Sequence, residues 1–114
     1  MPNQTLEFFF DYSSPFAYLG AVAVEQAAKQ HKAEVIYRPM LLGAVFKEIG
    51  TPLVPLETFP KSKQAYYAQD LERWAQYRDV PFQFPSRFPM KTVHALRLTL
   101  VVMEDVPPLV PKLI

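Results

Sequence analysis

The sequence predicts an α/β fold, and three segments near its start support this class. Residues 5–10 form a short apolar run rich in phenylalanine, residues 15–31 repeat apolar side chains at three- and four-residue spacing, and residues 34–38 centre on Val35, Ile36 and Tyr37. These patterns are typical of a strand, an amphipathic helix and a second strand. Together they make a βαβ unit, whose strands should be parallel and connected right-handedly.

The first strand, residues 5–10, is followed by an abrupt change to helix. Its continuous apolar character suits a strand that is buried on both faces of a sheet. Ser14 is a favourable N-cap residue, and Pro15 fits the first helical position because its missing N–H would be unpaired there. Pro39 ends the second strand.

Helical spacing continues after the βαβ unit, over residues 40–49, 62–78 and 91–104. Gly50 is a plausible C-cap for the first of these helices. In the second, the side chains expected to be buried are Tyr66, Leu71, Trp74 and Tyr77. Residues 80–89 are an aromatic and proline-rich connection. We therefore expect one domain over residues 1–114, in which residues 1–38 form the βαβ unit and residues 39–105 are mostly helical.

Composition argues against several classes of protein. Twelve Lys and Arg residues against eleven Asp and Glu residues give a net charge of +1, which offers no electrostatic support for a nucleic-acid or membrane partner. The chain has no cysteine and only two histidines, so it supplies no thiol nucleophile and we expect no metal site. Neither a signal peptide nor a membrane-spanning segment is visible, and we expect a soluble, cytoplasmic protein.

Ser14 carries the sharpest chemical signal in the chain. A helix that begins at Pro15 has partial positive charge at its N-terminus, and Ser14 adds a hydroxyl there. The turn at residues 11–14 could therefore hold an anion such as a thiolate, a carboxylate or a phosphate. The alternative is that Ser-Pro simply starts a helix, because caps of this kind are common.

Four segments, taken together, resemble the 2-hydroxychromene-2-carboxylate isomerases. They are FFFDYSSPFAYLG from Phe8, RPMLLGAVFKEIG from Arg38, residues 63–75, and VPFQFPSRFP from Val80, and the similarity runs from about Leu6 to Arg97 in matching order. This family is related to kappa-class glutathione transferases and, more remotely, to DsbA-like disulfide oxidoreductases. The resemblance implies a thioredoxin-like βαβ unit followed by a mostly helical insertion.

The resemblance also implies that glutathione is the thiol cofactor, in agreement with a chain that has no cysteine. In the family, the serine before the proline of the Ser-Pro motif hydrogen-bonds the glutathione sulfur, and the matching residue is Ser14. The cofactor-binding positions that the resemblance implies are Ser14, Pro15, Phe16, Thr51 and Lys63. Kappa-class members commonly carry an asparagine at the position of Thr51. Lys47 matches a segment where a cation would meet a substrate carboxylate.

The activity implied is glutathione-dependent cis–trans isomerisation of 2-hydroxychromene-2-carboxylate-type aromatic catabolites. It proceeds by thiolate addition to a conjugated double bond, rotation and elimination, in the bacterial degradation of naphthalene-type compounds. A kappa-type glutathione transferase is one alternative. Because the family continues with the second half of the thioredoxin-like sheet, we expect a truncated domain. A second alternative is therefore a catalytically incompetent fragment that persists by self-association, with a homodimer as one arrangement.

Overall fold

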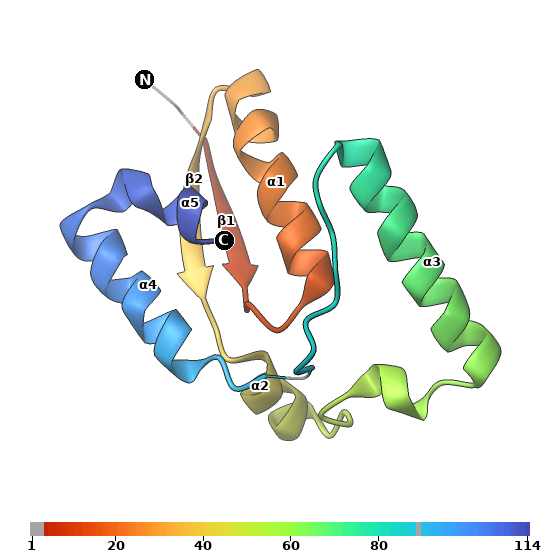
Figure 1. Ribbon diagram of the computed structural model, residues 1–114. Helices are drawn as coiled ribbons and strands as arrows, with labels where there is room; N and C mark the ends of the chain where they lie inside the picture. Colours follow the sequence, from red (N-terminus) through yellow and green to blue (C-terminus); the bar gives the residue numbers. More distant parts are fainter. Residues whose placement is uncertain (1–3, 89) are drawn as a thin grey trace.

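The computed structural model describes residues 4–88 and 90–114 (Figure 1). In chain order the elements are β1 (Gln4–Phe10), α1 (Pro15–Gln30), β2 (Ala33–Pro39), α2 (Leu42–Ile49), α3 (Lys61–Arg78), α4 (Val93–Asp105) and α5 (Val110–Leu113). Two 3-10 turns, Pro55–Thr58 and Pro107–Leu109, lie before α3 and after α4. The helices and strands predicted from the sequence all form, with ends that differ by one or two residues.

β1 and β2 pair in parallel, which confirms the predicted βαβ arrangement. Gln4 lies opposite Ala33 and Phe10 opposite Pro39, and no residue is skipped between them. The N–H of Met40 donates to the carbonyl of Phe10 at 3.0 Å, so the pairing continues one residue past β2. Asp11 and Met40, which follow the two strands, therefore lie at the same carboxyl end of the sheet.

The expectation that the first strand is buried on both faces is wrong. Phe10 is buried at its end, whereas Phe9 is 56% exposed and Leu6 is 40% exposed. Within residues 4–88 and 90–114 the sheet has two strands only, so no further strand covers the outer side of β1. The face that carries Glu7 and Phe9 is also open, and an exposed ion pair joins Glu7 to Arg38 at 2.8 Å.

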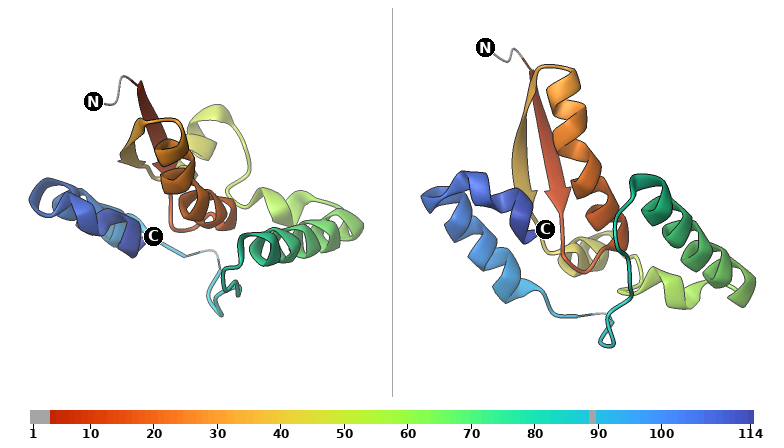
Figure 2. Two further views of the ribbon diagram at one scale, coloured as in Figure 1. Left: turned by 90° about the horizontal axis from the view of Figure 1, so that it is seen from above. Right: turned by 45° about the horizontal axis from the view of Figure 1, so that its top comes forward.

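The main core lies on the other face of the sheet. Its buried members are Phe10, Val24, Tyr37, Leu96 and Val110. α1 supplies Val24, while Leu96 and Val110 arrive from α4 and α5, which are distant in sequence. Figures 1 and 2 show α4 and α3 on opposite sides of the βαβ unit. The C-terminal helices therefore complete a core that α1 begins.

A buried phenol marks the edge of this core. The hydroxyl of Tyr37 donates to Oε1 of Glu25 on α1 at 2.6 Å. Burial raises the pKa of Tyr37 above its ordinary value, and the hydrogen bond to Glu25 and the charge of that carboxylate add to the effect. The neutral phenol is therefore the form that the fold stabilises.

α3 packs on α1 through a second, smaller cluster. Leu71 and Ala75, one turn apart on α3, are buried against Leu19 of α1. Of the four side chains expected to be buried on this helix, only Leu71 is; Tyr66, Trp74 and Tyr77 are 59%, 46% and 74% exposed. The buried stripe of α3 is narrow, and α1 is the helix against which it packs.

The ends of two helices follow from local chemistry. α1 begins at Pro15 with Ser14 as its N-cap, as predicted. α2 ends at Gly50, whose φ of 77° is left-handed and favours glycine, which confirms the predicted C-cap. No helix in the described ranges is long and apolar enough to cross a membrane.

Candidate functional site

The turn between β1 and α1 places Ser14 at the mouth of the helix. The N–H of Ser14 donates to the carbonyl of Asp11 at 3.0 Å, and the N–H of Ser13 donates to Oδ1 of Asp11 at 3.2 Å. Oγ of Ser14 accepts from the N–H of Ala17 at 3.2 Å. That bond uses a lone pair of the hydroxyl and leaves its proton free to be donated elsewhere.

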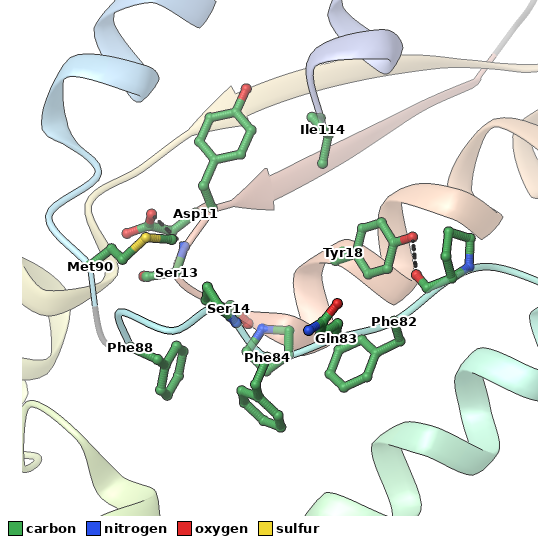
Figure 3. A pocket seen from close by; sticks show the side chains of 14 residues that line it. Asp11, Ser13, Ser14, Tyr18, Phe82, Gln83, Phe84, Phe88, Met90 and Ile114 are labelled. Carbon is green, nitrogen blue, oxygen red and sulfur yellow. Dashed lines mark hydrogen bonds between the residues drawn. The ribbon is translucent and has the colours of Figure 1, made fainter.

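A pocket of about 250 Å³ opens beside this turn (Figure 3). Residues 11–15 and Tyr18 form one side. The opposite side consists of residues 81–85, Phe88 and Met90, from the segment that joins α3 to α4, and Ile114 closes one end. Ser14 therefore faces a cavity rather than open solvent.

The wall opposite Ser14 is a run of aromatic rings. Tyr18 and Phe82 stack with ring centroids 6.4 Å apart, Phe82 meets Phe84 edge-on at 5.3 Å, and Phe84 meets Phe88 at 5.4 Å. The hydroxyl of Tyr18 donates to the carbonyl of Pro81 at 2.6 Å, which fastens the wall to α1. Geometry of this kind suits a flat, conjugated ligand.

Sequence reasoning treated residues 80–89 as a connection and did not identify this wall. The available signal was the aromatic spacing of Phe82, Phe84 and Phe88 among prolines. In the structure Phe82 and Phe84 pack against the cluster of Leu19, Leu71 and Ala75 as well as lining the pocket.

Asp11 is the other residue that the sequence did not single out. Its side chain is buried, with 2% exposed, and lines the pocket. Besides Ser13, it accepts from the hydroxyl of Thr92 at 2.5 Å and from the N–H of Leu42 at 2.8 Å. The turn that presents Ser14 is thereby tied to the beginnings of α2 and α4.

The other sequence-predicted site residues fall into three places. Pro15 lines the pocket beside Ser14. Phe16 packs edge-on against Tyr67 of α3 with centroids 5.9 Å apart, and Nζ of Lys63 lies 4.0 Å from the centre of the Phe59 ring and 5.9 Å from that of Tyr67.

Lys47 and Thr51 lie at the C-terminal end of α2. Lys47 is exposed in the last turn, and the N–H of Thr51 donates to the carbonyl of Phe46 at 2.9 Å. Phe16, Lys63, Lys47 and Thr51 are not among the lining residues of the pocket. The structure thus brings Ser14 and Pro15 together and groups Phe16 with Lys63.

The family model of the DsbA-like thioredoxin domain matches residues 5–108. The chain belongs to the DsbA-like thioredoxin domain family. Its two-stranded sheet and helices correspond to part of that fold, which confirms the fold that the resemblance implied.

Relatives of known name point in the same direction. The chain is 35% identical over 87 residues to a 2-hydroxychromene-2-carboxylate isomerase of Sphingobium xenophagum, covering 75% of this chain and 44% of the relative. It is 31% identical over 106 residues to glutathione S-transferase kappa 1 of Caenorhabditis elegans, covering 88% and 46%. The chain thus spans less than half the length of these relatives.

A solved 2-hydroxychromene-2-carboxylate isomerase superposes with a TM-score of 0.61. The superposition covers 96% of this chain and 64% of that structure, at 23% sequence identity. At this identity the likeness concerns the fold.

Proposed function

We propose that this chain forms the Ser14 side of a glutathione-dependent isomerase that acts on 2-hydroxychromene-2-carboxylate-type compounds. The observation that carries the proposal is the free proton of the Ser14 hydroxyl at the N-terminus of α1, beside an aromatic-walled pocket. Similarity to proteins named 2-hydroxychromene-2-carboxylate isomerase supports the reaction class.

The residues present suit a thiol cofactor. The chain has no cysteine, so a thiolate must be brought by a bound molecule, and glutathione is the cofactor that the family implies. A free thiol with a pKa of about 8.5 is mostly protonated at neutral pH. A hydroxyl donor and the positive end of a helix dipole both stabilise the thiolate and increase its population.

In this proposal the residues that line the pocket have separate roles. Glutathione, when bound, would supply a thiolate nucleophile for reversible addition to a conjugated double bond. Ser14 donates to the sulfur, and Pro15 shapes the pocket beside it. The aromatic wall holds the flat substrate.

Four further residues are assigned outside the pocket. Phe16, Lys63 and Thr51 are proposed contacts for the peptide portion of glutathione, and Lys47 is a proposed partner of a substrate carboxylate. Phe16 and Lys63 share Tyr67 as a neighbour, which supports a common surface for them near the first turn of α1.

Substitutions at Ser14 test the proposal. Glycine at an N-cap costs only a few tenths of a kcal/mol, so Ser14→Gly removes the hydroxyl and leaves the helix start nearly intact. We expect the pKa of bound glutathione, followed by thiolate absorbance, to rise toward the free value of about 8.5. Isomerase turnover should fall by about a hundredfold, the typical effect of losing one donor to a developing anion.

Ser14→Thr, which keeps both a hydroxyl and an N-cap, is the matched control and should retain most of the activity. Equal turnover in Ser14→Gly and the unmodified protein would remove Ser14 from the reaction. Absence of calorimetric glutathione binding to the unmodified protein would remove the cofactor as well.

A kappa-type glutathione transferase is the second candidate. Asp11 is the one charged residue among those that line the pocket, so nothing in this lining set pairs with a substrate carboxylate. A neutral, flat electrophile fits such a surface. Assaying isomerisation of the chromene carboxylate beside conjugation of chlorodinitrobenzene separates the two activities, because only a transferase forms a stable carbon–sulfur bond and releases chloride.

The third candidate is an incompetent fragment that persists by self-association. The observation in its favour is the outer edge of β1, which has no strand partner in the described residues, next to the exposed Phe9. Such edges pair readily with other chains. A monomer in sedimentation that unfolds in one cooperative transition would contradict this alternative.

A further inference from the structure

Asp11 receives hydrogen bonds from three separate parts of the chain. Oδ1 accepts from the N–H of Ser13 and from the hydroxyl of Thr92, and Oδ2 accepts from the N–H of Leu42. Leu42 and Thr92 lie 31 and 81 residues further along the chain. This buried carboxylate holds one local donor, Ser13, and two distant ones, and so it links its own turn to segments that lie far away in the sequence.

The surroundings of the Asp11 side chain require a group that only accepts hydrogen bonds. Two of the three donors are backbone N–H groups, one on each side-chain oxygen. In either orientation, an asparagine would point its NH₂ at one of these N–H groups, so no asparagine rotamer satisfies both. Among side chains of this length, the aspartate carboxylate alone fits all three donors.

The same carboxylate caps the start of α2 and holds the residue that precedes α4. Leu42 is the first residue of α2, and the residue before it makes no side-chain capping bond, so Asp11 supplies the missing acceptor. Thr92 immediately precedes α4, and its hydroxyl donates to Asp11 instead of capping its own helix. Negative charge beside helix N-termini is stabilising, which adds to the hydrogen bonds.

We propose that Asp11 is a positioning residue that sets the separation between the Ser14 turn and the aromatic wall. On one side Asp11 begins the turn that ends at Ser14. On the other side its partner Thr92 lies two residues after Met90, which also lines the pocket and is drawn beside Asp11 in Figure 3. Phe82 and Phe84 are held separately by packing against Leu19, Leu71 and Ala75, so releasing Thr92 frees the Met90 end of the wall to move relative to Ser14.

The consequence for glutathione rests on the proposed function, whereas the consequence for pocket geometry does not. A misplaced wall weakens ligand binding and shifts the sulfur away from the Ser14 hydroxyl. Small displacements of this kind matter because hydrogen bonds weaken steeply with distance and angle.

Thr92 offers a matched pair of variants. Thr92→Val keeps the shape and removes the hydroxyl, and Thr92→Ser keeps the hydroxyl. Both should fold, because two other contacts still hold α4. Leu96 is buried in the main core, and a hydrogen bond joins the Tyr12 hydroxyl to Oγ1 of Thr99 at 2.6 Å. Asp11→Asn is the stronger variant, and its outcome is read only if a cooperative melt shows that it folds.

The measurements are amide NMR spectra and glutathione titrations at a temperature well below each melting transition. We expect Thr92→Val to shift the amide signals of Ser13, Ser14, Phe88 and Met90, to weaken glutathione binding by about tenfold, and to raise the pKa of the bound thiol. Thr92→Ser should match the unmodified protein. A purely structural role would lower the melting temperature and leave the affinity and thiol pKa of the folded protein unchanged.

Identical amide spectra for Thr92→Val and Thr92→Ser would overturn the positioning role. Altered spectra with unchanged glutathione affinity and thiol pKa would overturn it too, because the wall would then have no effect on the site. If the unmodified protein binds no glutathione, the proposed function fails, and the amide spectra alone decide whether Asp11 sets the pocket geometry.

Discussion

The buried pair of Tyr37 and Glu25 makes the stability of the protein sensitive to alkaline pH. The folded state holds the Tyr37 pKa above the value of about 10 found in an unfolded chain. The stabilisation is therefore complete below about pH 10 and is lost as the pH rises toward the folded pKa, because only the unfolded chain then releases its proton easily.

Thermal melts at a series of alkaline pH values test whether stability falls as the pH rises. Tyr37→Phe cannot ionise and should lose about 1 kcal/mol at neutral pH, with a smaller further loss than the unmodified protein between about pH 9 and 11. Tyr77→Phe, at a tyrosine that is 74% exposed, is the control and should follow the unmodified protein throughout. Parallel curves for all three proteins would contradict the assignment.

At the scale of elements, Gly43 in α2 and Gly50 at its C-cap should respond oppositely to substitution by alanine. Gly50 has a φ of 77°, a conformation that strains any residue with a Cβ, so Gly50→Ala should destabilise the protein by about 1 kcal/mol. Gly43 lies inside the helix, where a Cβ would meet Cδ2 of Leu53 at an ordinary contact distance of 3.7 Å.

Gly43→Ala should therefore stabilise the protein by about 0.5–1 kcal/mol, the usual advantage of alanine within a helix. Urea unfolding of the two variants measures both effects in one experiment. Equal shifts of the unfolding midpoint in the same direction would show that the end of α2 is not held in the left-handed conformation.

At the scale of the whole molecule, stability should be divided between the two clusters. The larger joins the sheet to α1, α4 and α5, whereas the smaller has three buried members, Leu19, Leu71 and Ala75. Fewer buried apolar contacts mean a lower free energy of local opening. α3 should therefore open without unfolding the sheet.

Native-state hydrogen exchange tests this division. We expect Leu71→Ala to speed exchange along α3 and to leave the amides of Val24 and Tyr37 protected. Leu96→Ala, in the main core, should speed exchange in the sheet as well. Uniform acceleration by both variants would indicate a single cooperative unit instead.

What could be predicted from the sequence depended on the range of the interactions involved. The βαβ start, the Ser14 cap and the Gly50 cap follow from neighbouring residues, so local patterns were sufficient for them. Tyr66, Trp74 and Tyr77 share a helix with Leu71, but which face is buried depends on where α1 lies. Helical spacing cannot supply that information.

The pocket is the clearest case of a feature beyond local pattern. Asp11 meets Thr92 only after the intervening helices have formed, and the aromatic wall lies beside Ser14 only because α1 and α3 have packed together. Ser14 could be identified as a candidate from its position at the N-terminus of a helix. The residues that surround it depend on contacts between segments separated by most of the chain.

The prolines of the aromatic wall have a consequence for conformational entropy. Pro81 and Pro85 fix the backbone φ at two positions of the pocket wall and narrow the conformations open to the unfolded loop. Part of the entropy cost of ordering Phe82 and Phe84 is thereby met when the chain folds, and a ligand that bound at this wall would lose less free energy in arranging the loop.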